Sequence, residues 1–159
     1  DLMTTPVVTL KPDAHLKDVA GILVRRGTNA APVVENGRLV GIVSEADLIA
    51  LEAGSDQRFA GRQAEQRPLP RTVREVMTRS VFTVSRDADA SQAARLLLRH
   101  NLKSVPVVVG DRVVGMISRR DLLRVIARSD DGIHAEITHR LEEEAEVLRR
   151  LGVEVRDGW

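Results

Sequence analysis

The sequence repeats itself at an offset of 74 residues, and this duplication constrains the fold more than any other feature. The stretch Met3 to Ile49 aligns without a gap with Met77 to Leu123. More than a third of the aligned positions are identical. The shared landmarks follow one order in both copies: Met-Thr, a single Thr, Asp-Ala, Pro-Val-Val and Gly-x-x-Ser-x-x-Asp. A repeat this long indicates a duplicated small domain rather than one unit of a solenoid.

Each copy shows the same order of hydrophobic patterns. A short β-prone segment, residues 7–10 in the first copy, precedes apolar residues at helical spacing. Two apolar runs follow at residues 30–34 and 38–43, separated by an Asn-Gly pair that is typical of a hairpin turn. The second copy has its two runs at residues 104–109 and 112–117. Each copy therefore predicts a helix followed by a β-hairpin.

A second helix is expected directly after each hairpin, from Glu45 and from Arg119. The predicted order is β-α-β-β-α, twice, which is an α/β fold. Gly, Pro and polar residues between the copies indicate a long connecting loop. We therefore expect repeat 1 at residues 1–53, a linker at 54–71, repeat 2 at 72–128 and a C-terminal appendage at 129–159.

Composition excludes several classes of function. Lys and Arg total 24 against 23 acidic residues, so neither nucleic acid nor an anionic membrane is an expected partner. The absence of cysteine excludes thiol nucleophiles and Cys-based zinc sites. No apolar run approaches the ~18 residues of a membrane span and no signal peptide is visible, so we expect a cytoplasmic protein. Because the sequence has no initiator Met, we expect the natural chain to be longer.

The sequence also lacks motifs that would support catalysis or bind a metal. His134 and His139 are five residues apart, so they do not share a helical face, and no phosphate-binding loop or nucleophile motif is present. We therefore expect no metal site, no catalytic residues and no enzymatic activity.

The ordered landmarks resemble the CBS domain, and two in tandem resemble a Bateman module. The resemblance covers roughly residues 1–128. It implies a pseudo-twofold disc with two clefts, which in relatives bind AMP, ADP, ATP, S-adenosylmethionine or NAD-type ligands, while some members bind nothing.

Ser44-x-x-Asp47 and Ser118-x-x-Asp121 each lie where a strand is expected to turn into a helix. One interpretation is a capping box, in which the Ser and the acid satisfy the free N–H groups of the helix. The other is a ligand site, because a helix N-terminus suits a phosphate and a nearby carboxylate can accept hydrogen bonds from ribose hydroxyls. The resemblance implies the second role for Asp and Ser. One Ser can fill both roles.

The resemblance also implies that each cleft combines the Met-Thr segment of one repeat with the Ser-x-x-Asp motif of the other. The first cleft, named the Asp121 site, would contain Thr4, Thr9, Asn29, Ala30, Ala31, Lys103, Ser118, Arg119, Arg120 and Asp121. The second cleft, named the Asp47 site, would contain Thr78, Thr83, Asn29, Lys103, Ser104, Val105, Ser44 and Asp47.

The two sites differ in charge. Arg119 and Arg120 belong to the Asp121 site, whereas Glu45 and Ala46 take their places in the Asp47 site. Because phosphate oxygens favour guanidinium and ammonium donors, the Asp121 site is the preferred one for a polyphosphate. The alternative is that both arginines form a solvated first helical turn. With no Tyr and few other aromatic residues, aliphatic walls near the two Pro-Val-Val strands would hold adenine.

In the C-terminal appendage, the spacing of apolar residues predicts an amphipathic helix at residues 131–150. The following Val-x-Val-x-Asp-Gly segment alternates apolar and polar residues, which predicts a strand that enters a turn. This pattern resembles the start of a BON domain. The alternative is a helix that packs on the repeats or on a partner chain.

Two functions follow from these patterns. The first is a regulatory module that binds an adenine-containing nucleotide, with no catalytic cofactor, and forms a homodimer of repeat pairs. The second is a ligand-free scaffold for dimerisation or protein interaction. A nucleotide hydrolase is a third alternative, but no general base is apparent for it.

Overall fold

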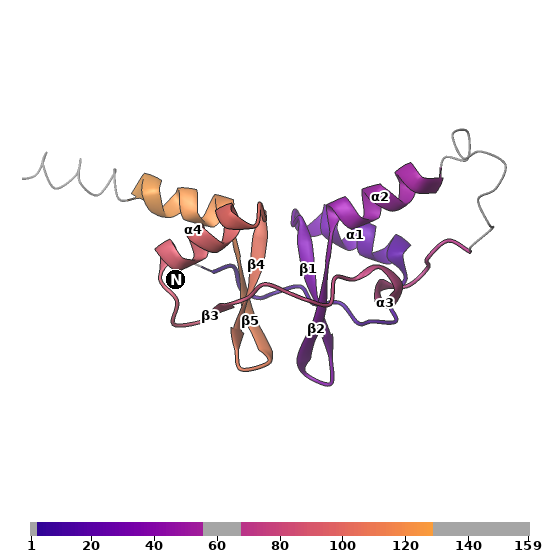
Figure 1. Ribbon diagram of the computed structural model, residues 1–159, viewed down its shortest axis with the longest axis horizontal. Helices are drawn as coiled ribbons and strands as arrows, with labels where there is room; N and C mark the ends of the chain where they lie inside the picture. Colours follow the sequence, from indigo (N-terminus) through magenta and orange to yellow (C-terminus); the bar gives the residue numbers. More distant parts are fainter. Residues whose placement is uncertain (1–2, 56–67, 129–159) are drawn as a thin grey trace, which may run out of the picture. The chain divides into compact units, whose positions relative to one another are not determined.

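The computed structural model of the chain describes residues 3–55 and 68–128. The chain divides into two compact units, residues 1–121 and 122–159, and residues 122–128 of the second unit are helical. The first unit contains two copies of a helix and a β-hairpin (Figure 1), which confirms the α/β fold class. The helix and strand predicted for residues 129–159 lie outside the described residues.

Each copy is built on one antiparallel hairpin. In repeat 1, β1 (Ala30–Glu35) pairs with β2 (Arg38–Ser44). In repeat 2, β4 (Ser104–Val109) pairs with β5 (Arg112–Ser118). Equivalent residues face each other in both pairs, and a register shift occurs at the same point of each. The duplicated sequence therefore forms two hairpins of the same register.

Both hairpins close with two-residue turns, as the sequence predicts. Asn36 and Gly37 have φ values of 51° and 76°, the left-handed conformation that a type I′ turn requires at both positions. In the second hairpin Gly110 alone has positive φ, at 61°. The Asn-Gly prediction of a tight hairpin is confirmed.

The first strand of each copy is shorter than predicted. Residues 7–10 contribute a single parallel bridge, between Leu10 and Val33, and β3 (Val84–Ser85) pairs with β4 over two residues. The reason is that the preceding Met-Thr segment leaves its own repeat. Thr4 pairs with Met116 of β5, so residues 5–9 must cross from one hairpin to the other.

Helices lie beside each hairpin and bury one face (Figure 1). Leu16, Val19 and Leu23 of the first helix join the core of repeat 1, and Ala93 and Leu97 are buried on the equivalent helix of repeat 2. Their spacing matches the predicted apolar pattern. The helices are α1 (Leu16–Arg26), α2 (Glu45–Ser55), α3 (Val73–Val76) and α4 (Ala90–Arg99), and residues 119–128 are also helical.

The one-turn helix α3 was not predicted, and it is part of the core of repeat 1. Val73 is 0% exposed and belongs to the same buried cluster as Leu10. Its N–H donates to the carbonyl of Ala14 (3.0 Å), and the N–H of Arg74 donates to the carbonyl of Pro12 (2.8 Å). The start of repeat 2 therefore completes repeat 1.

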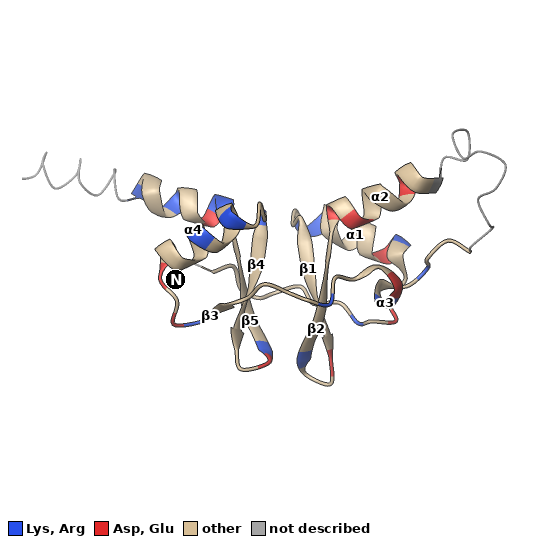
Figure 2. Ribbon diagram, viewed as in Figure 1, with Lys and Arg blue, Asp and Glu red and all other residues tan. Residues whose placement is uncertain are grey.

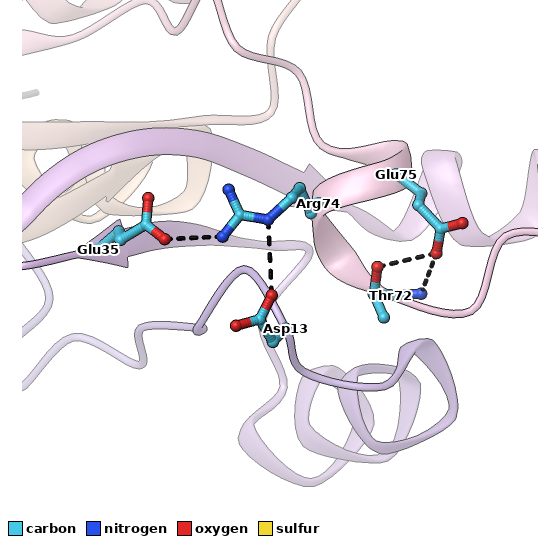
Figure 3. A network of polar contacts seen from close by, with 5 residues as sticks. All are labelled: Asp13, Glu35, Thr72, Arg74 and Glu75. Carbon is cyan, nitrogen blue, oxygen red and sulfur yellow. Dashed lines mark hydrogen bonds and ion pairs between the residues drawn. The ribbon is translucent and has the colours of Figure 1, made fainter.

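A capping box fixes the start of α3. The Glu75 carboxylate accepts hydrogen bonds from the Thr72 N–H (2.8 Å) and the Thr72 hydroxyl (2.8 Å) (Figure 3), and also from the Arg71 N–H (2.9 Å). The N–H donors of Arg71 and Thr72, and then the Thr72 hydroxyl, lower the pKa of Glu75. The carboxylate therefore stays ionised where the cap needs an acceptor.

Arg74 joins α3 to two parts of repeat 1. Its guanidinium lies 2.7 Å from a Glu35 carboxylate oxygen and 3.5 Å from one of Asp13 (Figure 3). The hydrogen bond and charge of Glu35, followed by the charge of Asp13, raise the pKa of Arg74. Both partners are acidic residues at the surface around the buried Val73.

No helix among residues 3–55 and 68–128 is both long and apolar enough to cross a membrane.

Candidate functional site

Each Ser-x-x-Asp motif lies where a hairpin ends and a helix begins. β2 ends at Ser44, and β5 ends at Ser118. Oδ2 of Asp121 accepts hydrogen bonds from the N–H (2.8 Å) and hydroxyl (2.7 Å) of Ser118, and the Asp121 N–H donates back to the Ser118 hydroxyl (3.3 Å). Ser44 and Asp47 make the same three bonds at 2.7, 2.8 and 3.3 Å. The capping-box interpretation is confirmed in both copies.

The Met-Thr segment of each copy lies on the other copy's hairpin. Thr4 exchanges backbone hydrogen bonds with Met116 of β5 at 2.8 and 3.3 Å. Thr78 does the same with Ile42 of β2 at 2.9 and 3.0 Å. The expected exchange of Met-Thr segments between the repeats is therefore present at both ends of the pair.

Two glycines allow this exchange. A Cβ atom on Gly41 would lie 2.7 Å from Sδ of Met77 and 3.1 Å from the carbonyl oxygen of Thr78. A Cβ atom on Gly115 would lie even closer to the side chain of Met3. A side chain at either glycine would push the Met-Thr segment off the hairpin, so the Gly of the repeated motif has a structural role at the site.

Thr4 and Asp121 meet across the two repeats. Asp121 is 8% exposed, and no other charged residue that the structure describes is buried. The Thr4 hydroxyl donates to its Oδ1 at 3.5 Å. The equivalent side chains of the Asp47 site, Thr78 and Asp47, share no hydrogen bond, and Asp47 is only half-buried. The Asp121 site is therefore the more closed of the two.

The strand starts of the two hairpins also meet. The Ser104 hydroxyl donates to Oδ1 of Asn29 at 2.7 Å, and the Lys103 ammonium forms an ion pair with Glu45. Ala30, Ala31 and Val105 are buried nearby in the strands that start here. Residues predicted for both sites thus form one polar junction between repeats.

Lys103 and Arg119, two of the three predicted basic residues of the Asp121 site, have protein partners in this structure. Arg119 donates through Nε to the Leu102 carbonyl (2.7 Å) and through an Nη to Oδ1 of Asn101 (3.0 Å). Arg120 is exposed and makes no hydrogen bond or ion pair to any residue that the structure describes. The first turn of α2 is acidic, whereas the equivalent turn of repeat 2 is basic (Figure 2).

Thr9 and Thr83, like Arg120, are not joined to the sites by any side-chain hydrogen bond among the described residues. Thr9 is exposed and precedes the Leu10 bridge to β1. Thr83 lines a cavity of about 410 Å³ between β3 and α4, together with residues such as Asp87 that were not predicted for either site.

Two residues at the site were missed by the sequence predictions. In the sequence, Glu45 is notable only as the acidic residue that takes the place of Arg119, yet Glu45 forms an ion pair with Lys103. Asn101 holds Arg119 from the end of α4, where it has a φ of 51°. Asn tolerates this left-handed conformation, which is the one signal in the sequence that could have marked the position. Groups of acidic and His residues that could hold a metal are absent from the described residues.

Comparisons with known proteins agree with this architecture. Residues 1–54 and 73–128 match the CBS domain family. The protein MJ1225 of Methanocaldococcus jannaschii is 35% identical over 130 residues, which are 80% of this chain and 46% of MJ1225. The chain spans 52% of MJ0188, another relative from the same organism. About half of each of these relatives is therefore matched.

Solved structures share the same fold. The CBS domain pair of protein MJ0100, in complex with 5′-methylthioadenosine and S-adenosyl-L-methionine, superposes with a TM-score of 0.69 at 27% identity, covering 81% of this chain and 94% of that one. CBSX2 in complex with AMP gives a TM-score of 0.67 at 27% identity, covering 82% and 96%. The duplicated hairpins, the exchanged Met-Thr segments and these matches show that the chain belongs to the CBS domain family and carries two CBS domains in tandem.

Proposed function

We propose that the chain is a regulatory, non-catalytic module that binds an adenine-containing nucleotide between its two CBS domains. The contact of Thr4 with the buried Asp121 carries the proposal, because it joins two repeats at the start of a helix. In this proposal the CBS domains occupy residues 1–53 and 72–128, and residues 54–71 link them. The MJ0100 and CBSX2 complexes contain adenosine-based ligands, which supports the same ligand class for this chain.

The chemistry of the Asp121 site suits a nucleoside. Ser118 holds Oδ2 of Asp121, so the carboxylate has a fixed orientation, and Oδ1 faces Thr4. A carboxylate in this setting can accept hydrogen bonds from both ribose hydroxyls. Replacing the long Thr4 contact of 3.5 Å by shorter ribose hydrogen bonds would strengthen the bonding of a buried charge. We propose Ala30 and Ala31 as apolar contacts for adenine, with Asn29 and Thr9 at the edge of this site.

Phosphate groups would lie toward the basic residues. Arg120 is exposed at the first turn of the helix that follows Ser118, where the positive end of the helix dipole also favours an anion. Lys103 and Arg119 would join it by exchanging Glu45, Asn101 and the Leu102 carbonyl for phosphate oxygens. We propose that a polyphosphate ligand binds this site in preference to the Asp47 site.

The Asp47 site is proposed as a weaker site for a nucleoside. Its members are Ser44, Asp47, Thr78, Thr83, Ser104 and Val105. Glu45 stands where Arg119 stands in the other copy, so the nearby charge disfavours phosphate.

A thermal-shift screen against ATP, ADP, AMP, S-adenosylmethionine and NADH tests the proposal. A ligand at 100 times its Kd should stabilise the protein by about 2.7 kcal/mol. For a chain of this length, Tm should rise by roughly 5–10 °C. A Kd for the best ligand then follows from calorimetric titration, and a product assay checks for nucleotide hydrolysis, which we expect to be absent.

Asp121→Ala and Asp47→Ala are matched variants, because each removes the acid of a capping box with identical geometry. We expect Asp121→Ala to abolish the response and Asp47→Ala to retain it. Equal responses in both variants would contradict the preference for the Asp121 site. No response to any ligand by the folded wild-type chain would refute nucleotide binding.

A ligand-free dimerisation scaffold is the second candidate, and exposed apolar side chains on the helices favour it. Val24 of α1, Ile49 of α2 and Leu98 of α4 are 82%, 65% and 71% exposed. Burial of such side chains against a second copy would stabilise a homodimer. Sedimentation of the wild type and Ile49→Lys tests this: a dimer that Ile49→Lys disrupts supports it, and a monomeric wild type refutes it.

A nucleotide can regulate only if it binds two arrangements of the protein with different affinity. A ligand-dependent change in the sedimentation coefficient would connect the two candidates. A cytoplasmic location and a BON-like region from residue 129 onward stay predictions.

A further inference from the structure

The helices that precede the two hairpins end with the same backbone geometry. Gly27 follows α1, and Asn101 occupies the equivalent position after α4. Both residues are left-handed, with φ values of 60° and 51°. The N–H of the next residue donates to the carbonyl of Leu23 (3.1 Å) in repeat 1 and of Leu97 (2.8 Å) in repeat 2. Glycine is therefore sufficient for this helix end, and the backbone alone does not require Asn101.

The side chain of Asn101 makes a contact that glycine cannot make. Its Oδ1 accepts a hydrogen bond from an Nη of Arg119 at 3.0 Å, and Nε of Arg119 donates to the Leu102 carbonyl at 2.7 Å. In repeat 1 the residue equivalent to Arg119 is Glu45, so that copy has no arginine to hold. The asparagine and the arginine thus occur together in the repeat where they contact each other.

The side chains of residues 45 and 119 have different partners although their backbones are anchored alike. The Glu45 N–H donates to the Asn29 carbonyl (2.8 Å), and the Arg119 N–H donates to the Lys103 carbonyl (3.0 Å). The Glu45 carboxylate pairs with Lys103 of the other repeat, whereas Arg119 contacts the loop of its own repeat. The orientation of Arg119 is therefore set by that loop, where Asn101 supplies the side-chain acceptor.

This contact bears on how the Asp121 site would meet a phosphate. A guanidinium binds a phosphate most strongly when two neighbouring N–H groups donate together. In Arg119, Nε and an Nη form one such edge, and both donate to the loop. A phosphate can bind this edge only after two hydrogen bonds break, and Asn101 accepts one of them.

We propose that Asn101 is a positioning residue that holds Arg119 away from the phosphate position of the Asp121 site, and thereby sets the preference of this site between a nucleoside and a polyphosphate. The inference rests on the proposed nucleotide site and adds the residue that controls its ligand class. A nucleoside binds through Asp121 without moving Arg119, whereas a polyphosphate that recruits Arg119 has to release it from Asn101.

Asn101→Gly tests the proposal, because glycine adopts the same backbone at position 27 and removes only the side-chain acceptor. The measurement is the ratio of the Kd values for adenosine and ATP, from calorimetric titration. We expect ATP affinity to rise by about three- to ten-fold, since recruitment of Arg119 breaks one hydrogen bond fewer, with adenosine affinity unchanged. Asn101→Asp should lower ATP affinity by about three-fold or more, because a charged acceptor holds the guanidinium more strongly.

Asn36 provides matched controls, because it has the same φ of 51° in the turn of the first hairpin. Asn36→Gly and Asn36→Asp make the same changes in backbone freedom and charge at a residue that belongs to neither site, so they should leave the ratio unchanged. In an Arg119→Gln background, Asn101→Gly should no longer alter the ratio, because the guanidinium that Asn101 holds is absent.

An unchanged ratio in Asn101→Gly, or an equal gain in the Arg119→Gln background, would overturn the role of Asn101 and leave nucleotide binding in place. A fall in ATP affinity in Asn101→Gly would also overturn it, because Asn101 would then present Arg119 to the phosphates. A folded wild-type chain that binds neither adenosine nor ATP would refute nucleotide binding itself, and this inference with it.

Discussion

The two CBS domains share their hairpins and caps but differ at their edges. Both Ser-x-x-Asp motifs form the same capping box, and both hairpins have the same register. Repeat 1 contains α3 in its core, whereas no helix of the described residues lies on the matching surface of repeat 2. Glu45 of repeat 1 faces Lys103, while its counterpart Arg119 is held by Asn101.

This difference separates the parts that form the fold from the parts that we propose to select a ligand. The Gly-x-x-Ser-x-x-Asp landmark forms the helix start, and the Met-Thr landmark forms the exchange between repeats. Both copies need these contacts, so both copies carry the same residues there. Charge at positions 45 and 119 is not repeated: Glu45 pairs with Lys103, whereas Arg119 is held by Asn101 and the Leu102 carbonyl. A duplicated domain can therefore diverge in charge at such positions without losing its fold.

The largest effect is expected from Val73→Ala, which tests whether α3 is part of the core of repeat 1. Val73 is 0% exposed, so loss of two methyl groups and the resulting cavity should lower the free energy of unfolding by about 2–3 kcal/mol. Urea denaturation followed by circular dichroism measures this change.

Val24→Ala is the control for α3, since Val24 is 82% exposed on α1. It should change the free energy of unfolding by less than about 0.5 kcal/mol. A similar value for Val73→Ala would mean that α3 is detached in solution, and the contrast between the two repeats would then disappear.

A smaller effect is expected from removal of the cap hydroxyls. Ser44→Ala should destabilise the chain by about 1 kcal/mol, the usual value for a lost N-cap. Ser118→Ala should destabilise it by about 2 kcal/mol, because it also removes a donor from the buried Asp121 carboxylate. Thermal unfolding of the two variants without ligand measures the difference. Equal losses would show that Asp121 is no more dependent on its donors than Asp47.

Local patterns in the sequence predicted the hairpins, the caps and the class of fold. Asn36-Gly37 specifies its turn through backbone conformation, and each Ser-x-x-Asp specifies its cap through a three-residue spacing. These features involve neighbours in the chain. The meeting of Thr4 with Asp121, 117 residues apart, came from the resemblance to CBS domains, because local patterns carry no information on such distant pairs.

Features that depend on packing between distant segments were not predicted. One helical turn at Val73–Val76 is too short to show an apolar period, so α3 was invisible in the sequence. The partners of Lys103 and Arg119 depend on how strand starts and helix ends are placed. For this reason Arg119 was predicted to face a phosphate, although Asn101 and the Leu102 carbonyl hold it in this structure.

Among the variants at the candidate sites, the smallest effect on stability is expected from Glu45→Gln, which removes the acidic partner of Lys103. The two side chains are 43% and 64% exposed, so the loss of their ion pair should change the free energy of unfolding by less than about 1 kcal/mol. Lys103 would then be free to contact a phosphate, and the repulsion by Glu45 would be lost. Affinity for a polyphosphate ligand at the Asp121 site should rise by about two- to five-fold at low salt, measured by calorimetric titration. Asp18→Asn changes the net charge equally on exposed α1 and should leave the affinity unchanged. An equal gain from both variants would assign the effect to net charge. The charges at positions 45 and 119 would then have no part in selecting the ligand.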